Sequence, residues 1–477
     1  MWMRRLRLLL VHVGRRTIEL PVITPPLGIM SLAAYLRERL PLTIRLIDQR
    51  LENATTTDLV RAAVDFEADV VGLGTLTPMA YLLPELTQKI RQALPKALIV
   101  LGGAHVAAFG ASALEDIEAD TAVPGEGEIA LEKILEAHAG GGGFGHIPGL
   151  IWRDPSGEII VNPGAIPYIE DLDSLPFPAY DLIDFSKYWR FETMVNMPPR
   201  RYAGFFSSRG CPYRCIYCHC IFGKHFRAQS PERIVAEIEH WQSIYGTKVV
   251  EFYDDTFNYD SGRVMEFCQL AIKRNLGLKI AFPNAIRGDI LTPEIVEALV
   301  DAGLYYTACA LETATPRLQK YIGKHLNISR FLEGVDMLAR RGVFTYGFTM
   351  LGFPTETEED LLRTINTTCG SMLHATSFFT VTPFPGTELY ARVLETRPEK
   401  LHGIDYRKKS YTNIMINLSE VPDAMLYGYQ RSAVRKFYLN PNRLFRILTS
   451  YPHPWYLPHY IPVLALRLSK GLFSLSS

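Results

Sequence analysis

The sequence predicts an α/β protein built from two consecutive units and a helical C-terminal region. Apolar runs of strand length alternate with stretches of helical spacing, a pattern typical of parallel α/β layers. A glycine run at 140–143 and a proline-rich segment at 173–179 interrupt this alternation once. At 477 residues the chain is too long for one hydrophobic core, so we expect two or three domains.

The first unit interleaves strands with helices, which predicts a Rossmann-like domain over residues 1–145. Its strands are buried apolar runs, and the third and fourth open into glycine-containing loops. The expected strands are 8–11, 43–47, 69–74 and 97–101, and the expected helices are 27–37, 57–66, 84–94 and 128–137.

The second unit follows a connector at 146–200, which contains an expected hairpin at 150–161. Six further strand–helix units at 201–390 predict a partial (β/α)6 barrel of the TIM type. The expected strands are 203–207, 249–253, 279–283, 305–311, 345–351 and 377–382, and the expected helices are 231–245, 262–275, 293–302, 328–341 and 358–371. Residues 391–477 form the helical C-terminal region in this interpretation.

Composition excludes several classes of protein. Lys plus Arg and Asp plus Glu number 50 each, so no excess positive charge indicates a nucleic-acid partner. Seven cysteines are an odd number, and three of them are clustered, which argues against a secreted disulfide framework. The basic and apolar N-terminus is short, and Arg15 and Arg16 follow it without a cleavage site. With no uncharged apolar run of about 18 residues, we expect a cytoplasmic protein.

A compact cysteine motif carries the most information about chemistry. Cys211, Cys215 and Cys218 have C-x3-C-x2-C spacing, so three thiolates can hold three corners of one metal cluster and leave the fourth open. A structural zinc site is the alternative, and it needs a fourth ligand such as His219 or Cys220.

Other polar or glycine residues also follow predicted barrel strands, where the chemistry of such barrels collects. They are Asp254 and Asp255 after the second strand, Arg287 after the third, Glu312 after the fourth and Gly352 after the fifth. Each has an ordinary alternative: a helix cap for the aspartates, any carboxylate partner for Arg287, a solvated acid for Glu312 and a turn for Gly352.

The cysteine loop resembles that of the radical S-adenosylmethionine (SAM) enzymes, whose signature has an aromatic residue before the third cysteine, here Tyr217. The resemblance implies a [4Fe-4S] cluster on the three cysteines, with SAM chelating the fourth iron. It also implies SAM contacts for Tyr217, Asp254, Asp255, Glu312 and Gly352, and a guanidinium fork at Arg287 suits the SAM carboxylate. The family's Gly-Gly-Glu pattern is replaced here by Tyr-Asp-Asp-Thr at 253–256.

Four motifs in the first unit resemble the cobalamin-binding domain of class B radical SAM enzymes. They lie at 25–28, 69–77, 102–105 and 125–128, and glycines at strand ends let a large cofactor approach the backbone. The resemblance implies cobalamin contacts for Pro26, Gly28, Thr75, Leu76, Thr77, Gly102, Gly103, His105, Gly125, Glu126 and Gly127. The Asp-x-His-x-x-Gly motif of a histidine-ligated cobalamin is absent, and a Rossmann-like domain that has lost its ligand is the alternative.

The resemblance predicts a cobalamin-dependent radical SAM enzyme, in the first place a C-methyltransferase. A 5′-deoxyadenosyl radical from SAM would abstract hydrogen from a small-molecule substrate, and methylcobalamin would deliver the methyl group. Cyclisation, oxidation or ring rearrangement with the same cofactors is the second hypothesis, and a non-enzymatic cobalamin or iron–sulfur sensor is the third. A flavodoxin or ferredoxin is the expected reducing partner. A methylthiotransferase is disfavoured because no cysteine precedes Cys211.

The C-terminus allows two interpretations. Leu464, Leu468 and Leu472 share one face of a predicted helix, with Arg467 and Lys470 beside them. Such a helix caps the barrel or lies in a membrane interface, where it would favour a lipophilic substrate.

Overall fold

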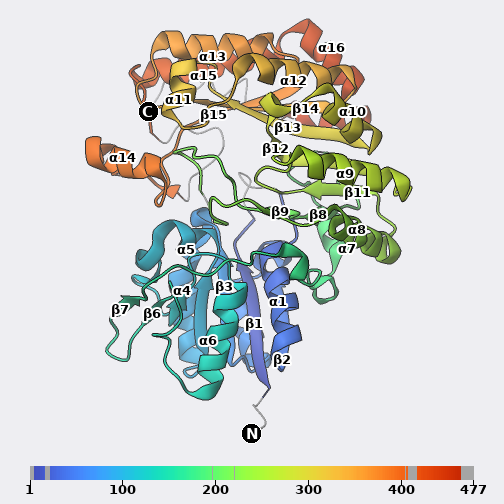
Figure 1. Ribbon diagram of the computed structural model, residues 1–477. Helices are drawn as coiled ribbons and strands as arrows, with labels where there is room; N and C mark the ends of the chain where they lie inside the picture. Colours follow the sequence, from blue (N-terminus) through green and yellow to red (C-terminus); the bar gives the residue numbers. More distant parts are fainter. Residues whose placement is uncertain are drawn as a thin grey trace.

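The computed structural model describes residues 5–16, 22–195, 197–219, 221–402, 404–406 and 416–462. Two α/β units follow one another along the chain, and helices of the C-terminal region cover the second unit (Figure 1). Within the described residues, no helix is both long and apolar enough to cross a membrane.

The N-terminal unit is a sheet of seven strands in the order β2-β1-β3-β4-β5-β6-β7, which confirms the Rossmann-like prediction. β1 to β5 are parallel, and the expected hairpin β6–β7 extends the sheet as an antiparallel edge. The strands are β1 Leu6–Val13, β2 Leu42–Asp48, β3 Val70–Thr75, β4 Leu98–Gly102, β5 Thr121–Ala122, β6 Ile151–Arg153 and β7 Ile159–Val161.

Helices cover both faces of this sheet. α1 and α6 pack on one face through residues such as Met30 and Ile134, and α3 and α4 pack on the other through Leu59 and Ile90. The helices are α1 Leu27–Arg39, α2 Gln49–Glu52, α3 Thr56–Asp65, α4 Leu83–Ala93, α5 Ala104–Phe109 and α6 Glu128–Gly140. The short α5 and β5 were not predicted.

The second unit is a parallel sheet of six strands in the order β15-β14-β13-β12-β11-β8, as predicted for a partial barrel. Its strands are β8 Ala203–Phe205, β11 Val249–Phe252, β12 Lys279–Ile286, β13 Leu304–Glu312, β14 Phe344–Leu351 and β15 Ala375–Thr380. The helices are α7 Phe185–Tyr188 in the connector, α8 Pro231–Tyr245, α9 Ser261–Lys273, α10 Pro293–Asp301, α11 Pro316–Tyr321, α12 Ile328–Arg340 and α13 Glu358–Gly370.

A small hairpin stands at the start of this unit. β9 Ser208–Arg209 and β10 Arg227–Ala228 pair antiparallel, with Arg209 opposite Arg227. The three-cysteine loop lies between these two strands, so their pairing closes its base.

The C-terminal region contributes α14 Glu388–Thr396, α15 Asp423–Tyr438 and α16 Pro441–Ser450. α15 lies along edge strand β15, where the Tyr438 hydroxyl accepts from Thr376 N (3.0 Å) and donates to its carbonyl oxygen (2.7 Å). After α16, Tyr451 packs against Phe344 at the start of β14. The predicted amphipathic residues from Leu464 to Leu472, with Arg467 and Lys470, lie outside the described residues.

Candidate active site

The cysteine loop is held in place by close backbone packing. Gly210 has a φ of +85° and packs against the carbonyl group of His225, where a side chain has no room. Gly323, with a φ of +68°, packs in the same way against the carbonyl group of Arg214. The loop therefore presents Cys211 and Cys215 half-buried and Cys218 exposed on a rigid support.

The electrostatics of the loop favour a thiolate at Cys215, whereas the hydrogen bond with Cys215 and burial raise the pKa of Cys218. A hydrogen bond with Cys218 lowers the pKa of Cys215 to about 6, and the positive charge of Lys324 acts in the same direction. The Cys211 sulfur lies 3.4 Å from the hydroxyl of Thr256. Because thiolates are the ligands of iron–sulfur clusters, these residues fit the predicted cluster.

The alternative zinc site would take its fourth ligand from His219 or Cys220. The ring of His219 instead packs edge-on against Phe384, with 5.5 Å between ring centroids. Cys220 lies outside the described residues.

The two predicted SAM-contacting aspartates differ in their surroundings. Asp254 is buried and accepts hydrogen bonds from Ser207 N (3.1 Å), from the Ser207 hydroxyl (2.8 Å) and from the Ser208 hydroxyl. It thus holds the end of β8 to the end of β11, a role that differs from the prediction. Asp255 remains exposed, although protein surrounds much of its carboxyl group; this desolvation and the charge of Asp254 raise its pKa to about 6.

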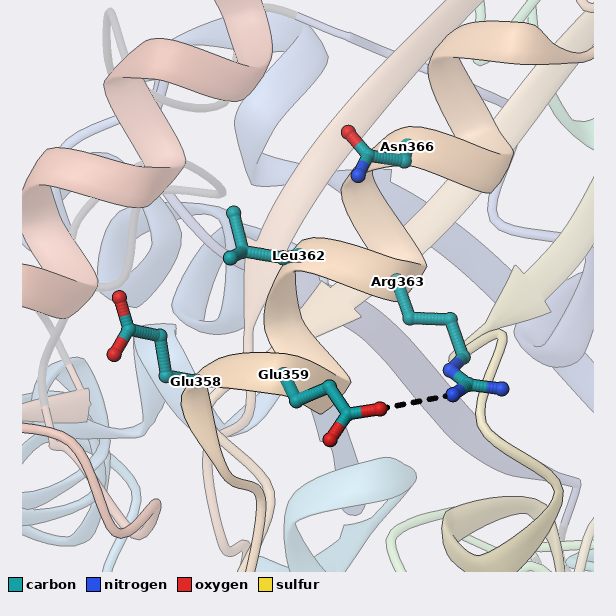
Figure 2. A pocket seen from close by; sticks show the side chains of 5 residues that line it. All are labelled: Glu358, Glu359, Leu362, Arg363 and Asn366. Carbon is teal, nitrogen blue, oxygen red and sulfur yellow. Dashed lines mark hydrogen bonds and ion pairs between the residues drawn. The ribbon is translucent and has the colours of Figure 1, made fainter.

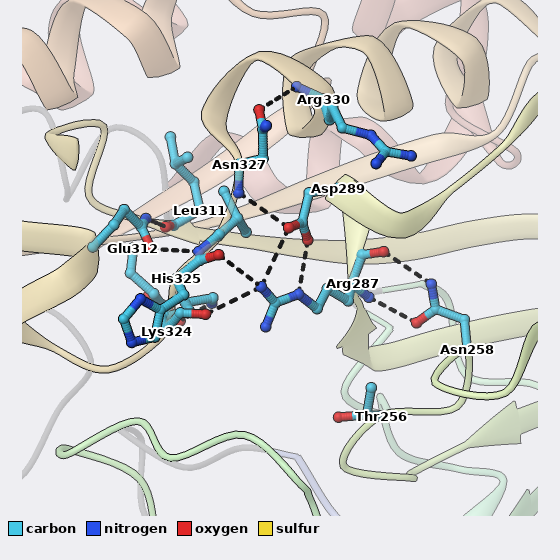
Figure 3. A network of polar contacts seen from close by, with 12 residues as sticks. Thr256, Asn258, Arg287, Asp289, Leu311, Glu312, Lys324, His325, Asn327 and Arg330 are labelled. Atoms are coloured by element: carbon cyan, nitrogen blue, oxygen red, sulfur yellow. Dashed lines mark hydrogen bonds and ion pairs between the residues drawn. The ribbon is translucent and has the colours of Figure 1, made fainter.

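Arg287 also has a different partner from the one predicted. Its Nε and Nη2 donate to the carboxylate of Asp289 at 2.8 and 3.2 Å, and Nη2 also donates to the carbonyl of Lys324 at 3.1 Å (Figure 3). Its guanidinium lies 3.8 Å from the ring centre of Tyr213 in the cysteine loop. Arg287 therefore braces that loop, whereas the prediction had its fork facing a SAM carboxylate.

Glu312 has an unfilled acceptor. Its backbone is strained, with a φ of +64°, and it lies beside a register shift between β13 and β14. Its Oε1 accepts from Lys324 Nζ at 3.2 Å, whereas Oε2 is buried without a hydrogen-bond partner among the described residues (Figure 3). A buried acceptor of this kind fits a donor group of SAM. The buried Lys324 was not predicted, since nothing in the local pattern marks it.

Gly352 lies close to the predicted aromatic residue Tyr217. Gly352 has a φ of +90°, and its N–H donates to the buried Glu356 carboxylate at 2.5 Å. The next residue, Phe353, packs edge-on against the ring of Tyr217, with centroids 5.8 Å apart. Burial raises the pKa of Glu356 to about 8. The loop after β14 is thereby fixed against the cysteine loop.

Four of the predicted cobalamin-contacting residues lie at the carboxyl edge of the N-terminal sheet with features that suit a ligand. These features are open space, an exposed apolar side chain and a polar atom without a hydrogen-bond partner. A Cβ atom at Gly28 or Gly102 would meet no atom within 4 Å. Leu76 follows β3, and its apolar side chain is 44% exposed. The buried His105 has no hydrogen-bond partner for Nδ1 among the described residues, and burial lowers its pKa to about 4. These residues fit a large cofactor with both apolar and polar parts.

Other predicted residues face the protein itself. The hydroxyl of Thr75 is buried and donates to the carbonyl of Val13 at 3.0 Å. Glu126 is buried and pairs with two arginines of the second unit. Of the remaining predicted positions, Pro26 precedes α1 and Thr77 begins a 3-10 turn. Three glycines pack closely: Gly103 against the backbone of Thr75, Gly125 against the side chain of Ile166 and Gly127 against the side chain of Leu32.

A series of aromatic rings joins the two sets of loops. His105 packs on Phe109 of α5 with a centroid separation of 4.5 Å, and Phe109 meets Tyr406 at 6.5 Å. Tyr406 packs on Phe384 at 5.3 Å, and Phe384 meets His219 next to Cys218. The loop after β4 and the cysteine loop are therefore parts of one site. Tyr406 has no distinctive sequence context, so it was not predicted.

A separate hollow lies on the outer side of α13 (Figure 2). It is lined by Glu358, Glu359, Leu362, Arg363 and Asn366, and Glu359 pairs with Arg363 at 3.0 Å. It contains none of the predicted site residues, so we assign it no role in the chemistry.

Comparison with known proteins identifies both units. Residues 205–368 match the radical SAM superfamily, and residues 16–135 match the B12 binding domain. The chain therefore joins a B12 binding domain to a radical SAM domain and is a cobalamin-dependent radical SAM enzyme. Its cofactors are a [4Fe-4S] cluster, SAM and cobalamin, as the sequence predicted.

The relatives include both methyltransferases and a cyclase. The uncharacterized methyltransferase PH0819 of Pyrococcus horikoshii is 28% identical, over 88% of this chain and 89% of that protein. Cytidylyl-2-hydroxyethylphosphonate methyltransferase of Streptomyces wedmorensis is 25% identical, over 78% of each chain. Anaerobic magnesium-protoporphyrin IX monomethyl ester cyclase of Rubrivivax gelatinosus is 24% identical, over 87% of this chain and 75% of that protein.

Among solved structures, the fold is similar to that of the radical SAM methyltransferase TsrM from Kitasatospora setae, which has cobalamin and a [4Fe-4S] cluster bound. The TM-score is 0.69 at 18% identity, and the match covers 82% of this chain and 78% of that chain. The likeness supports the arrangement of the two units in this fold.

Proposed function

We propose that this enzyme is a methyltransferase that places a methyl group on an unactivated carbon of a small molecule. The observation that carries the proposal is the contact between the two sets of loops, from His105 and Phe109 through Tyr406 and Phe384 to His219. Two reactive groups must reach the same substrate carbon, and such a contact holds them close together. The two relatives named as methyltransferases support the same activity.

Each set of residues has a definite task in this proposal. Cys211, Cys215 and Cys218 would hold the cluster, and Glu312 would accept a hydrogen bond from SAM. When bound, the cofactors supply a hydrogen-abstracting radical and a transferable methyl group. The aromatic side chains between the loops would exclude water and so limit side reactions of the reactive intermediates. A one-electron donor such as a flavodoxin or ferredoxin is the proposed reductant.

Cyclisation is the second candidate function. It is favoured by the cyclase of Rubrivivax gelatinosus, which aligns with 87% of this chain. A cyclase would use the same radical chemistry and would transfer no methyl group to its product.

Labelled SAM separates the two candidates. Anaerobically reconstituted enzyme is supplied with CD3-labelled SAM, a reductant and small-molecule extracts of the host, and the products are analysed by mass spectrometry. A product that carries the CD3 group supports methyl transfer. A product altered in mass without label, formed together with 5′-deoxyadenosine, supports cyclisation and overturns the methyltransferase proposal.

The cysteines supply matched controls for this assay. Cys211→Ala, Cys215→Ala and Cys218→Ala should each impair the cluster and abolish SAM cleavage, whereas Cys369→Ala on α13 should keep both. Loss of activity in the Cys369 variant as well would show that the assay reports folding and not the cluster.

A further inference from the structure

Two arginines at the base of the cysteine loop bind the N-terminal unit. Arg209 and Arg227 are opposite one another in the β9–β10 hairpin, one on each side of the loop. Arg209 Nη1 lies 2.9 Å from Glu126 Oε2, and Arg227 Nη2 lies 2.5 Å from Glu126 Oε1. One carboxylate of the N-terminal unit therefore joins both strands that carry the cysteine loop.

The surrounding contacts complete this ion cluster. Arg209 Nη2 pairs with Glu128 Oε1 at 2.7 Å, so two guanidinium groups meet two carboxylates and the charges balance. Arg227 Nη1 donates to the carbonyl of Ile169 at 2.7 Å, and the Ile169 N–H donates to Glu126 Oε2 at 3.2 Å. The Glu126 side chain is 1% exposed and that of Arg227 is 2% exposed. Both Glu126 oxygens are occupied by protein donors.

Glu126 links these ion pairs to the predicted cobalamin site through its place in the fold. Glu126 lies in the loop between β5 and α6, at the carboxyl edge of the sheet that also carries Gly102. Gly127 packs closely against α1, where a Cβ atom would stand 2.9 Å from the Leu32 side chain. Each guanidinium forks between Glu126 and a second acceptor, which is Glu128 for Arg209 and the Ile169 carbonyl for Arg227. A loop on the cobalamin side is thus tied to the base of the loop that carries the cluster cysteines.

We propose that Glu126 is a positioning residue that sets the separation and orientation of cobalamin relative to the iron–sulfur cluster. It does so through Arg209 and Arg227 and touches neither cofactor. Catalytic groups generally have to be held within about 0.5 Å of their productive geometry, and paired supports of this kind supply that accuracy. The inference does not depend on the proposed methyl transfer, since it concerns only where the cofactors sit.

Electron paramagnetic resonance of the substrate-free holoenzyme tests the proposal. With cobalamin as cob(II)alamin and the cluster reduced, each paramagnetic centre speeds the relaxation of the other, and this enhancement falls steeply with their separation. Glu126→Gln should retain both cofactors and change the enhancement clearly, because Gln keeps the shape but loses the paired charge. Glu237→Gln is the matched control: Glu237 is also buried and pairs with Arg233 at 2.9 Å, within α8.

Two milder variants keep the test decisive if Glu126→Gln fails to fold. Arg227→Lys keeps the charge without the fork, and Glu126→Asp keeps the charge with a shorter reach. Both should show a changed enhancement with normal iron and cobalamin contents, and both changes should be smaller than that in Glu126→Gln because the charge pairs remain. Wild-type enhancement in folded, fully loaded variants would overturn the proposal. So would an equal change in the Glu237→Gln control.

Discussion

Replacing Gly323 with alanine should push the backbone of the cysteine loop at Arg214 and Cys215 away from Gly323. A Cβ atom there would overlap the carbonyl oxygen of Arg214, and it would lie 3.2 Å from the carbonyl carbon and 3.8 Å from the Cα of Cys215. The backbone of Cys215 must therefore retreat, or the β13–α12 connection must open. Either response moves one cluster ligand relative to the other two.

The expected effect of Gly323→Ala has two parts, a loss of folding stability and a displacement of the cysteine loop. The φ of +68° at Gly323 costs an alanine about 1–2 kcal/mol in free energy of unfolding, whatever its neighbours. Gly342 has a φ of +77° and no atom within 4 Å of a Cβ, so Gly342→Ala measures this backbone cost alone. The overlap at Gly323 adds a shift on the order of 1 Å, and a misplacement of that size can lower an enzymatic rate about a hundredfold.

Iron content and SAM cleavage after anaerobic reconstitution measure the outcome. Gly342→Ala should lose a little stability and keep its full iron content, about four atoms per chain. Gly323→Ala should lose iron or cleave SAM far more slowly, beyond its change in stability. Equal iron content, cleavage rate and melting temperature in the two variants would refute the argument.

Three further predictions address other parts of the molecule. Burial raises the pKa of Glu356 from its ordinary 4.5 to about 8, so the folded state binds the extra proton and stability should fall as pH rises between these values. Glu356→Gln should flatten that dependence in thermal melts recorded from pH 5 to 8, and an unchanged slope contradicts the assignment. Gly102→Val should lower cobalamin retention with an unchanged melting temperature, because its Cβ meets open space; full cobalamin content in the variant would sink this idea. Phe445 and Trp455 are exposed, and replacing both by Ser should reduce flotation with anionic liposomes without lowering the melting temperature; equal flotation of both proteins leaves no membrane role for them.

The long elements of the fold could be predicted because a strand buried on two faces leaves a continuous apolar run, and a helix buried on one face leaves apolar residues at helical spacing. β14 and α8, for example, begin and end within about two residues of their expected bounds. The six-residue helix α5 and the two-residue strand β5 could not be predicted, since neither is long enough to show a period. These two short elements take up regular structure only because they pack against longer neighbours.

The sequence indicates candidate site residues where the chemistry depends on local spacing, but it cannot show which partners the fold brings to them. The cysteine spacing is a local property, so it could be recognised directly. Asp254 and Asp255 are adjacent in sequence, and only the fold shows that Ser207 and Ser208 donate hydrogen bonds to the carboxylate of Asp254. Glu126 was assigned to the cofactor because its motif resembles one of the cobalamin-binding domain, whereas the arginines that pair with it in the fold lie far along the chain.

The contact of α15 with strand β15 also bears on how copies of the protein behave at high concentration. An open barrel ends in an edge strand whose unpaired N–H and C=O groups can join the sheet of a neighbouring molecule. Here Tyr438 occupies both backbone groups of Thr376, and Gln430 donates to the carbonyl of Phe378 at 2.8 Å. Two side chains of α15 thereby occupy backbone groups at which strand-to-strand aggregation could otherwise begin.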